Sequence, residues 1–482
     1  MMLSAGSLSI MNVIDRWFLS DYSTDALAAA LPAGVLHWTI LSVAIGTVMY
    51  VNTFVAQYEG AGRPDRVVAA VWQGWYLSLV SGVLLGGFYF LSPTIFDWIG
   101  HAPEVRSHEV DYFAVLSAGS IAFVTSSALS SYFSGRRRTM VVLMVNLLSV
   151  MVNVVVDYVL IEGRGGFPEL GIRGAAIGTI ASRAVATACY ALLMWLESRR
   201  SDFDFRKETS IDLELVRRIL RFGLPNGIHF FVDVAGFSIF VFVIGSLGAK
   251  ELAATSLAFN LNTLAFVPLI GMGIAVSTLV GNRVGEGRPE LAVKTTWSAF
   301  QISAAWMLAF AAVYLFFPDW ILAPYRSENP QEFAAINSMV VTLLRFVSAY
   351  CFFDAMLVIF SNAVRGAGDT RFPMLITFVC CWLVMVVPTW IHTTWFSDLS
   401  NPASRERALW FGWSSCTAYI ALAGVAIMLR FMSGKWKSMR VIEKSVVTDA
   451  DVLPAATSAN DADSAASAAS DAPHVHEDSL VS

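Results

Sequence analysis

Charged residues are scarce in this sequence: 14% of its 482 residues are Asp, Glu, Lys or Arg, whereas 56% are hydrophobic. This composition excludes an ordinary water-soluble domain and favours a membrane protein. A phosphate-binding glycine loop, a zinc-ligand pair and a nucleophile elbow are all missing, so we expect no enzyme, no cofactor and no ATP-driven machine. The five cysteines lack metal-ligand or redox spacing. We expect no nucleic acid as a partner, although the net charge of −5 is a misleading guide: much of the acid lies in the last forty residues, while Lys and Arg collect in particular loops.

Apolar runs of about 17–25 residues between polar breaks predict membrane-spanning helices. We count twelve, which makes the expected fold an all-α membrane protein. They cover approximately 1–20, 27–57, 67–96, 110–133, 140–161, 172–196, 220–247, 253–282, 292–317, 335–364, 372–397 and 408–431.

The sequence contains an internal repeat. Residues 24–75 align without a gap with residues 249–300, and 16 of these 52 positions are identical. A second echo, with a slightly longer offset, pairs Gly135 and Thr139 with Gly366 and Thr370. Six helices per copy is an even number, so both copies enter the membrane from the same side and form two parallel six-helix repeats. Transporters are commonly built from such repeats, with the substrate site between the copies.

Loop charges predict the orientation. One alternating set of loops holds 22 Lys and Arg residues and the other holds seven. Positive residues mark the cytoplasmic side, so we expect both termini inside. The expected parts are an N-lobe at 1–197, a cytoplasmic loop at 198–219, a C-lobe at 220–432 and a disordered cytoplasmic tail at 433–482. The tail prediction rests on the Ala, Ser and Asp composition of 445–482.

Four carboxylates interrupt the apolar segments: Asp15, Asp157, Asp233 and Asp354. Each buried charge costs on the order of 2.5–3.5 kcal/mol on insertion scales, which favours a functional reason for it. An apolar cavity favours the protonated form of a carboxylate, so such groups can carry protons, or several oxygens can together hold Na⁺. The structural alternative is that each acid pairs with an intramembrane arginine, for which Arg16, Arg183 and Arg345 are available.

Polar residues one helical turn from these acids complete two predicted sites. Tyr350 precedes Asp354 by four residues, Asn153 precedes Asp157 by four, and His229 precedes Asp233 by four. We assign Asp233, Asp354, Asn260 and His229 to substrate binding. No metal is expected beyond a Na⁺ ion at Asp233, Tyr350 and Asp354.

Several motifs, taken together, resemble those of the MATE (multidrug and toxic compound extrusion) transporters, in particular the NorM-like branch, from about residue 10 to residue 432. They are Gly60-Ala61-Gly62-Arg63-Pro64 with its repeat Gly285-Glu286-Gly287-Arg288-Pro289, Asp157-Tyr158, the run 166–176, and Arg365-Gly366-Ala367-Gly368-Asp369-Thr370. The resemblance implies two lobes in a V-shaped arrangement that export organic cations in exchange for H⁺ or Na⁺ across a bacterial inner membrane.

The resemblance also implies two cation-coupling sites. Asp233, Tyr350 and Asp354 match the C-lobe site of the family, and Asp15, Asn153 and Asp157 match its N-lobe site. Two residues depart from the family pattern. Asp233 stands where the NorM-like branch often has Glu, and Arg16 replaces the small polar residue that usually follows the first acid.

The expected mechanism is antiport by alternating access, with amphipathic or cationic small molecules as substrates, membrane lipid as surroundings and no obligate protein partner for a monomer. Two alternatives remain. A flippase for lipid-linked oligosaccharides uses a related repeat fold but requires a basic cavity, and here four acids face three arginines in the helices. A membrane-embedded enzyme would require a catalytic cluster that the sequence lacks.

Overall fold

The computed structural model describes residues 11, 14–199, 203–328 and 330–443, and every regular element in these ranges is helical. Residues 14–22 form a helix ahead of the numbered ones. The elements are α2 (Thr24–Met49), α3 (Val51–Gly60), α4 (Pro64–Gly86), α5 (Phe88–Ile99), α6 (Pro103–Ala118), α7 (Ser120–Gly135), α8 (Thr139–Leu160), η1 (Arg164–Gly166), α9 (Ile172–Ser198), α10 (Leu213–Gly245), α11 (Ala249–Gly285), α12 (Pro289–Phe316), α13 (Pro318–Glu328), α14 (Pro330–Ala367), α15 (Arg371–Cys380), η2 (Cys381–Val386), α16 (Val387–Trp395), α17 (Pro402–Met432) and η3 (Lys435–Ser438).

Ten helices in the described residues are long and apolar enough to cross a membrane, and the bent pair α6 and α7 adds an eleventh. These spans match eleven of the twelve predicted segments and confirm the all-α membrane fold. The prediction for 1–20 lies mostly outside the described residues. The bend of 43° between α6 and α7 falls at Gly119. A Cβ at Gly119 would lie 2.3 Å from Cγ1 of Ile180 in α9, so the close approach there requires glycine.

The Gly-Arg-Pro motif performs the same local task in both repeats. Gly62 and Gly287 have φ angles of 67° and 74°, a left-handed conformation that glycine adopts without a steric cost. The proline two positions later begins the next helix, α4 in one copy and α12 in the other. Proline is well tolerated there because its missing N–H would have no helical partner anyway. The motif therefore makes a tight turn between two spans.

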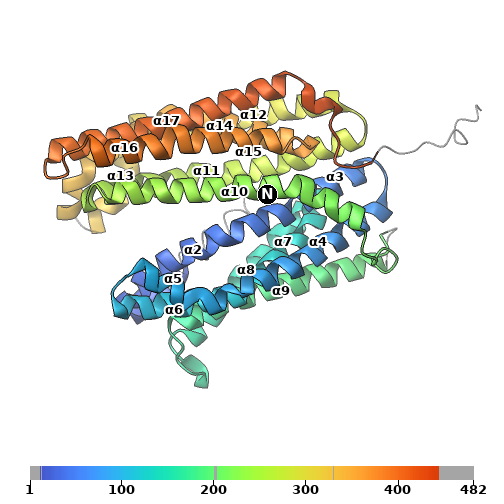
Figure 1. Cartoon of the computed structure of the whole chain (residues 1–482), viewed down its shortest axis with the longest axis horizontal. Helices are drawn as coiled ribbons and strands as arrows, with labels where there is room; N and C mark the ends of the chain where they lie inside the picture. The colour runs from blue at the N-terminus through green and yellow to red at the C-terminus, as the bar shows by residue number, and fades with distance from the viewer. Residues whose placement is uncertain (1–10, 12–13, 200–202, 329, 444–482) are drawn as a thin grey trace, which may run out of the picture. The chain divides into compact units, whose positions relative to one another are not determined.

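The helices form two bundles, shown in blue to green and in green to red (Figure 1). We call α2–α9 the N-lobe and α10–α17 the C-lobe. One buried hydrophobic cluster fills the C-lobe, and two fill the N-lobe. Many large apolar side chains on the outer faces are exposed, as expected for helices that face lipid.

The two lobes meet through equivalent residues of the repeat. A Cβ at Gly60 would lie 2.1 Å from the carbonyl oxygen of Asn282, and a Cβ at Gly285 would lie 2.1 Å from that of Gln57. The offset of the repeat pairs Gly60 with Gly285 and Gln57 with Asn282. The junction is therefore reciprocal, and each glycine lets the backbone of the other copy approach closely.

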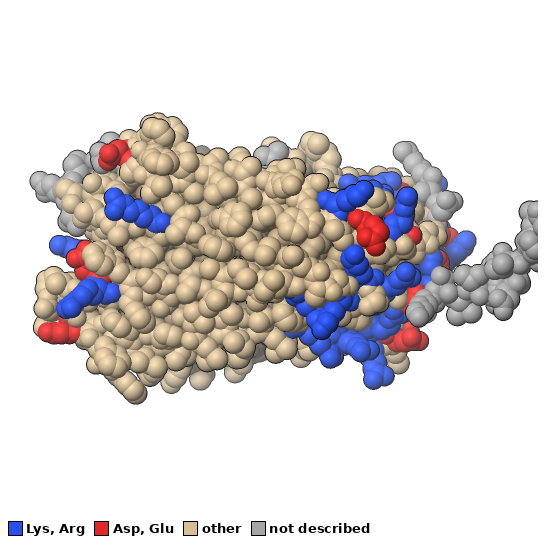
Figure 2. Space-filling model, turned by 90° about the horizontal axis from the view of Figure 1, so that it is seen from above, with Lys and Arg blue, Asp and Glu red and all other residues tan. Residues whose placement is uncertain are grey.

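Lys and Arg side chains gather at the end of the molecule where this junction lies (Figure 2). We call it the basic end. It is defined by Arg63 before α4, Arg288 before α12, Arg218 near the start of α10 and Arg440 after η3. The opposite end carries fewer cations in this view.

The segment after α17 crosses the basic end, and we call residues 433–442 the strap. Trp436 packs in the C-lobe cluster, and its ring stacks on Phe431 with centroids 5.0 Å apart. Val441 and Ile442 pack in a cluster of the N-lobe. The Val441 N–H donates to Oε1 of Gln57 over 3.0 Å. The prediction of disorder from residue 433 onwards is wrong for the strap, because its apolar side chains differ from the Ala, Ser and Asp residues that follow.

The predicted loop 198–219 is shorter than expected. The helix α9 ends at Ser198, but α10 begins at Leu213 rather than at residue 220. Asp212 caps α10 by accepting the Leu215 N–H over 3.0 Å, and its other oxygen accepts from Arg66 of α4 over 3.0 Å. This cap adds two helical turns that the apolar pattern alone does not contain.

Candidate functional site

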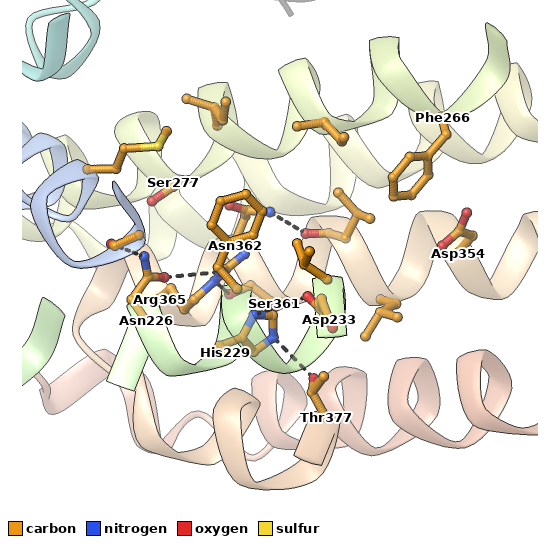
Figure 3. Close-up of a pocket in the computed structure, with 18 of the residues that line it drawn as sticks. Asn226, His229, Asp233, Phe266, Ser277, Asp354, Ser361, Asn362, Arg365 and Thr377 are labelled. Carbon is orange, nitrogen blue, oxygen red and sulfur yellow. Dashed lines mark hydrogen bonds and ion pairs between the residues drawn. The ribbon is translucent and has the colours of Figure 1, made fainter. Parts of the chain in front are cut away.

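A pocket of about 560 Å³ lies between the lobes, a size typical of small-molecule sites. The N-lobe contributes α2, α3 and α7 to its wall, and the C-lobe contributes α10, α11, α14, α15 and α17. Aromatic and aliphatic side chains make up much of the lining, among them Phe230, Phe237, Phe259, Phe266 and Ile270. Several of the polar residues that line it are labelled in Figure 3.

Asp233 lies in the wall of this pocket, two helical turns beyond Pro225 on α10. The Tyr419 O–H donates to its Oδ1 over 3.2 Å, and Nδ1 of His229 lies 3.3 Å from its Oδ2. The Asp233 side chain keeps 35% of its surface exposed, so a small molecule or ion in the pocket can reach the carboxylate.

Asp354 and Tyr350 line the same pocket from α14. Their spacing of four residues places them on one helical face, as predicted. Asp354 is 4% exposed and Tyr350 is 2% exposed. Figure 3 shows Asp354 toward one end of the pocket and Arg365 toward the other, with Asp233 between them. The structure thus brings the three residues of the predicted C-lobe site to one cavity.

The two other residues assigned to substrate binding differ in their placement. His229 lines the pocket, and its Nε2 lies 3.1 Å from Oγ1 of Thr377, so both ring nitrogens have neighbours. Asn260 does not line it: this residue is exposed, whereas Asn262 and Thr263 of the same helix face the pocket. Two residues correspond to about 200° of rotation around an α-helix, so Asn260 points away from the pocket and Asn262 faces it, contrary to the expected placement of Asn260.

The predicted N-lobe residues form a separate, enclosed cluster. Asp15 lies beside Asn153 and Asp157 of α8, and the Thr179 O–H donates to its Oδ2 over 3.3 Å. Asn153 and Asp157 are fully buried. A Cβ at Gly178 of α9 would lie 1.9 Å from Oδ1 of Asp157, so glycine makes room for this carboxylate. None of the three predicted residues lines the pocket.

Arginine pairing does not explain the four acids. In the described residues, no arginine lies within ion-pair distance of Asp15, Asp157, Asp233 or Asp354. The side chains of Arg16 and Arg345 are exposed, although each lies close to an acid in the sequence. The structural alternative considered for the sequence is therefore wrong for the described part of the chain.

Two pocket residues escaped the sequence analysis. Tyr419, which bonds to Asp233, is a single tyrosine in an apolar helix and gives no signal of its own. Arg365 is one of the 22 Lys and Arg residues of the predicted cytoplasmic loops, yet it lines the pocket and donates from Nη1 to Oδ1 of Asn226 over 3.0 Å. A signal for Arg365 was present: the offset that pairs Gly135 with Gly366 also pairs Arg365 with the uncharged Ser134.

The arrangement can bind cations in two different ways. In the pocket, two carboxylates in a mainly apolar wall attract an organic cation, and aromatic faces add to that attraction. In the N-lobe, two adjacent buried carboxylates can share a proton or hold a small cation through oxygen atoms. The described residues contain no group of three or more His, Cys, Asp or Glu side chains placed to hold a metal ion.

Two bundles, built from a parallel repeat around a mainly apolar cavity that holds two carboxylates, define a multi-pass membrane transporter. The family model MatE matches residues 1–159 and 225–391, one stretch in each lobe. The chain therefore belongs to the MatE family.

Individual relatives align with this chain over nearly its whole length. The chain is 27% identical over 442 residues to the "Probable multidrug resistance protein NorM" of Thermotoga maritima, covering 91% of this chain and 92% of the relative. It is 28% identical over 445 residues to the protein of the same name from Pseudomonas putida, with coverages of 91% and 92%.

Solved structures share the fold. The structure titled "Crystal structure of MATE in the straight conformation" superposes with a TM-score of 0.79 at 20% identity, covering 91% of this chain and 94% of that one. A Pyrococcus furiosus transporter superposes with a TM-score of 0.78 at 21% identity, with coverages of 91% and 94%, and its title reports a binding pocket of reverse polarity.

Proposed function

We propose that this chain is a multidrug efflux antiporter, which exports cationic or amphipathic organic compounds in exchange for H⁺ or Na⁺. The observation that carries the proposal is the pocket between the lobes, where Asp233 and Asp354 face an apolar and aromatic wall without an arginine partner in the described residues. The names of the NorM relatives support the same substrate class.

The proposed cycle depends on competition at the two carboxylates. On the outer side, H⁺ or Na⁺ binds to Asp233 and Asp354, weakens their attraction for the organic cation, and the cation leaves. On the inner side, the ion departs and the negative pocket binds the next cation. Such an exchange requires a coupling free energy between ion and substrate, typically 1–3 kcal/mol. Loose substrate selection follows, because apolar walls with few polar groups discriminate poorly.

We place the basic end in the cytoplasm of a bacterial inner membrane, because Lys and Arg mark the inner side. This orientation puts both termini inside, and the protein acts as a monomer in this proposal. The junction of Gly60 with Asn282 and of Gly285 with Gln57 then closes the inner side of the pocket.

The flippase alternative requires a pocket that attracts pyrophosphate. Among the described lining residues, two carboxylates face a single guanidinium, that of Arg365. Arg365 is also engaged by Asn226. This balance favours an organic cation as substrate over a lipid-linked pyrophosphate.

Efflux from proteoliposomes tests the proposal. We expect purified protein to expel a cationic dye under an imposed pH or Na⁺ gradient, and Asp354→Asn to abolish that efflux. Asp398→Asn, an exposed acid near the opposite end, is the matched control and should retain full efflux. Efflux by the Asp354→Asn protein at the normal rate would contradict the site.

The same vesicles identify the coupling ion. Efflux driven by a pH gradient in Na⁺-free buffer assigns H⁺, and efflux that requires Na⁺ assigns Na⁺. If neither gradient drives efflux but a lipid-linked substrate crosses the bilayer, the flippase function replaces the proposal.

A further inference from the structure

A second groove lies at the surface of the basic end. Four arginines and one acid line a groove of about 750 Å³: Glu214, Arg217, Arg218, Arg221 and Arg371. Three of the arginines lie in the first turns of α10, and Arg371 is the first residue of α15. The groove therefore collects a net positive charge from two different helices.

The arginines of this groove differ from others at the basic end. Arg136 pairs with Glu59 and Glu197, and Arg430 pairs with Asp369. By contrast, Arg217, Arg221 and Arg371 form no ion pair with a carboxylate in the described part of the chain. Exposed guanidinium groups that form no ion pair with the one acid in the groove, Glu214, can bind a phosphate group.

The two helices run side by side below the groove. Oγ1 of Thr377 on α15 lies 3.1 Å from Nε2 of His229 on α10. Arg371 precedes Thr377 by about 9 Å of helix and Arg221 precedes His229 by about 12 Å, at 1.5 Å per residue. These two arginines consequently lie at similar depth.

Exposed apolar residues continue the groove toward the middle of the membrane span. On α10, Leu224 and Ile228 follow Arg217 and Arg221 at helical spacing along one face. On α15, Leu375 and Val379 follow Arg371 in the same way. The surface thus carries a cluster of arginines at the basic end and two rows of exposed apolar residues that continue from it along α10 and α15.

We propose that this groove is a binding site for an anionic phospholipid, whose phosphate lies among Arg217, Arg221 and Arg371 and whose acyl chains lie along α10 and α15. The arginines match the negative charge of the phosphate, and the exposed apolar residues along the two helices match the acyl chains. A lipid held there would touch α10, which also carries Asp233, and Arg218, which holds the strap by donating to the Val441 carbonyl.

Native mass spectrometry of the full chain tests the site. The detergent-solubilised protein is titrated with phosphatidylglycerol and phosphatidylcholine of identical acyl chains. We expect preferential retention of phosphatidylglycerol, and a loss of roughly fivefold in that preference for each arginine removed, as estimated for a basic residue near an anionic lipid. The variant combines Arg217→Gln, Arg221→Gln and Arg371→Gln.

A charge-matched control separates this groove from general attraction. Arg288→Gln, Lys294→Gln and Lys435→Gln together remove three exposed cations from the basic end and should leave the preference unchanged. Equal losses in both triple variants, or no preference in the unmodified protein, would overturn the proposal. If the first triple variant fails to fold, the single variants Arg221→Gln and Arg371→Gln carry the test.

A soluble anion is distinguished by its lack of acyl chains. Excess glycerol phosphate should not displace the bound phosphatidylglycerol. Displacement by glycerol phosphate at equal affinity would replace the lipid with a soluble phosphate compound as the ligand.

Discussion

The two lobes hold equal numbers of intramembrane acids in opposite environments. Asp233 and Asp354 of the C-lobe face the pocket, whereas Asp15 and Asp157 of the N-lobe lie in an enclosed cluster away from it. The repeat does not explain this difference, since its offsets pair Asp15 with Phe240 and Asp354 with Phe123. The duplication therefore supplied the scaffold, and the acids were placed separately in each copy.

The two lobes also differ in backbone geometry at equivalent positions of the repeat. The α6–α7 span bends at Gly119, while its counterpart α14 is one continuous helix with Tyr350 at the position that the second offset pairs with Gly119. A bulky residue at 119 would collide with Ile180, whereas Tyr350 fits beside the pocket. Symmetric packing at the basic end thus coexists with asymmetric chemistry in the middle of the spans.

The largest expected effect separates the two acid sites. Asp354→Asn removes a carboxylate from the pocket wall and should weaken binding of a cationic dye by up to about 150-fold, the upper range for coupled sites. Asp157→Asn changes a residue that does not touch the pocket and should leave the dissociation constant within about twofold. Fluorescence titration of both purified proteins measures the dissociation constant of the dye. An equal increase of this constant in both variants would show that both acid sites contribute to substrate binding.

The symmetric junction should respond equally in both copies. Gly60→Ala and Gly285→Ala each place a Cβ 2.1 Å from a carbonyl of the other lobe, so each should cost about 1–3 kcal/mol as the lobes shift apart. Thermal unfolding and spin-label distances across the basic end measure the change. Gly34→Ala is the control, because its nearest atom lies 3.7 Å away. A large effect in only one copy would show that the junction is not reciprocal.

A smaller effect tests the enclosed cluster. Gly178→Ala places a Cβ 1.9 Å from Oδ1 of Asp157, and this side chain must rotate away from Asp15. We expect a destabilisation of about 1 kcal/mol and an altered dependence of efflux on the driving ion, while dye affinity stays constant. Unchanged ion dependence would exclude the N-lobe cluster from coupling.

The smallest effect concerns the tie between the lobes at Asp212. Burial alone would raise the pKa of this carboxyl, but the Leu215 N–H and Arg66 lower it below its ordinary value. The carboxylate therefore contributes stability above the ordinary aspartate pKa of about 3.9, and that contribution is lost as pH falls through the lowered value. Asp212→Asn should cost about 0.5–1 kcal/mol at pH 7 and nothing at pH 2. An equal loss of stability at both pH values would show that the contribution of Asp212 does not depend on its charge.

The sequence predicted the fold well because long apolar runs determine where a chain can cross a bilayer. Asp233 and Asp354 were singled out because a charge in such a run is conspicuous, and Tyr350 because it lies one helical turn from Asp354; all three line the pocket. Arg365 and Asn260 show the limit: whether a residue near a helix end faces the pocket depends on helix rotation and length, which hydropathy does not report. The strap was not predicted because its few apolar residues are too few to cross a membrane. Their burial depends on contact with the N-lobe, which the sequence pattern does not show.

The strap connects the C-lobe to the N-lobe directly after α17, while the segment ahead of α10 connects the two lobes at the start of the C-lobe. Val441 and Ile442 are buried in their cluster, and the Gln57 hydrogen bond adds a polar contact beside them. Exposing two such side chains costs about 1.5–3 kcal/mol each. This short segment therefore helps to hold the two lobes together at the basic end.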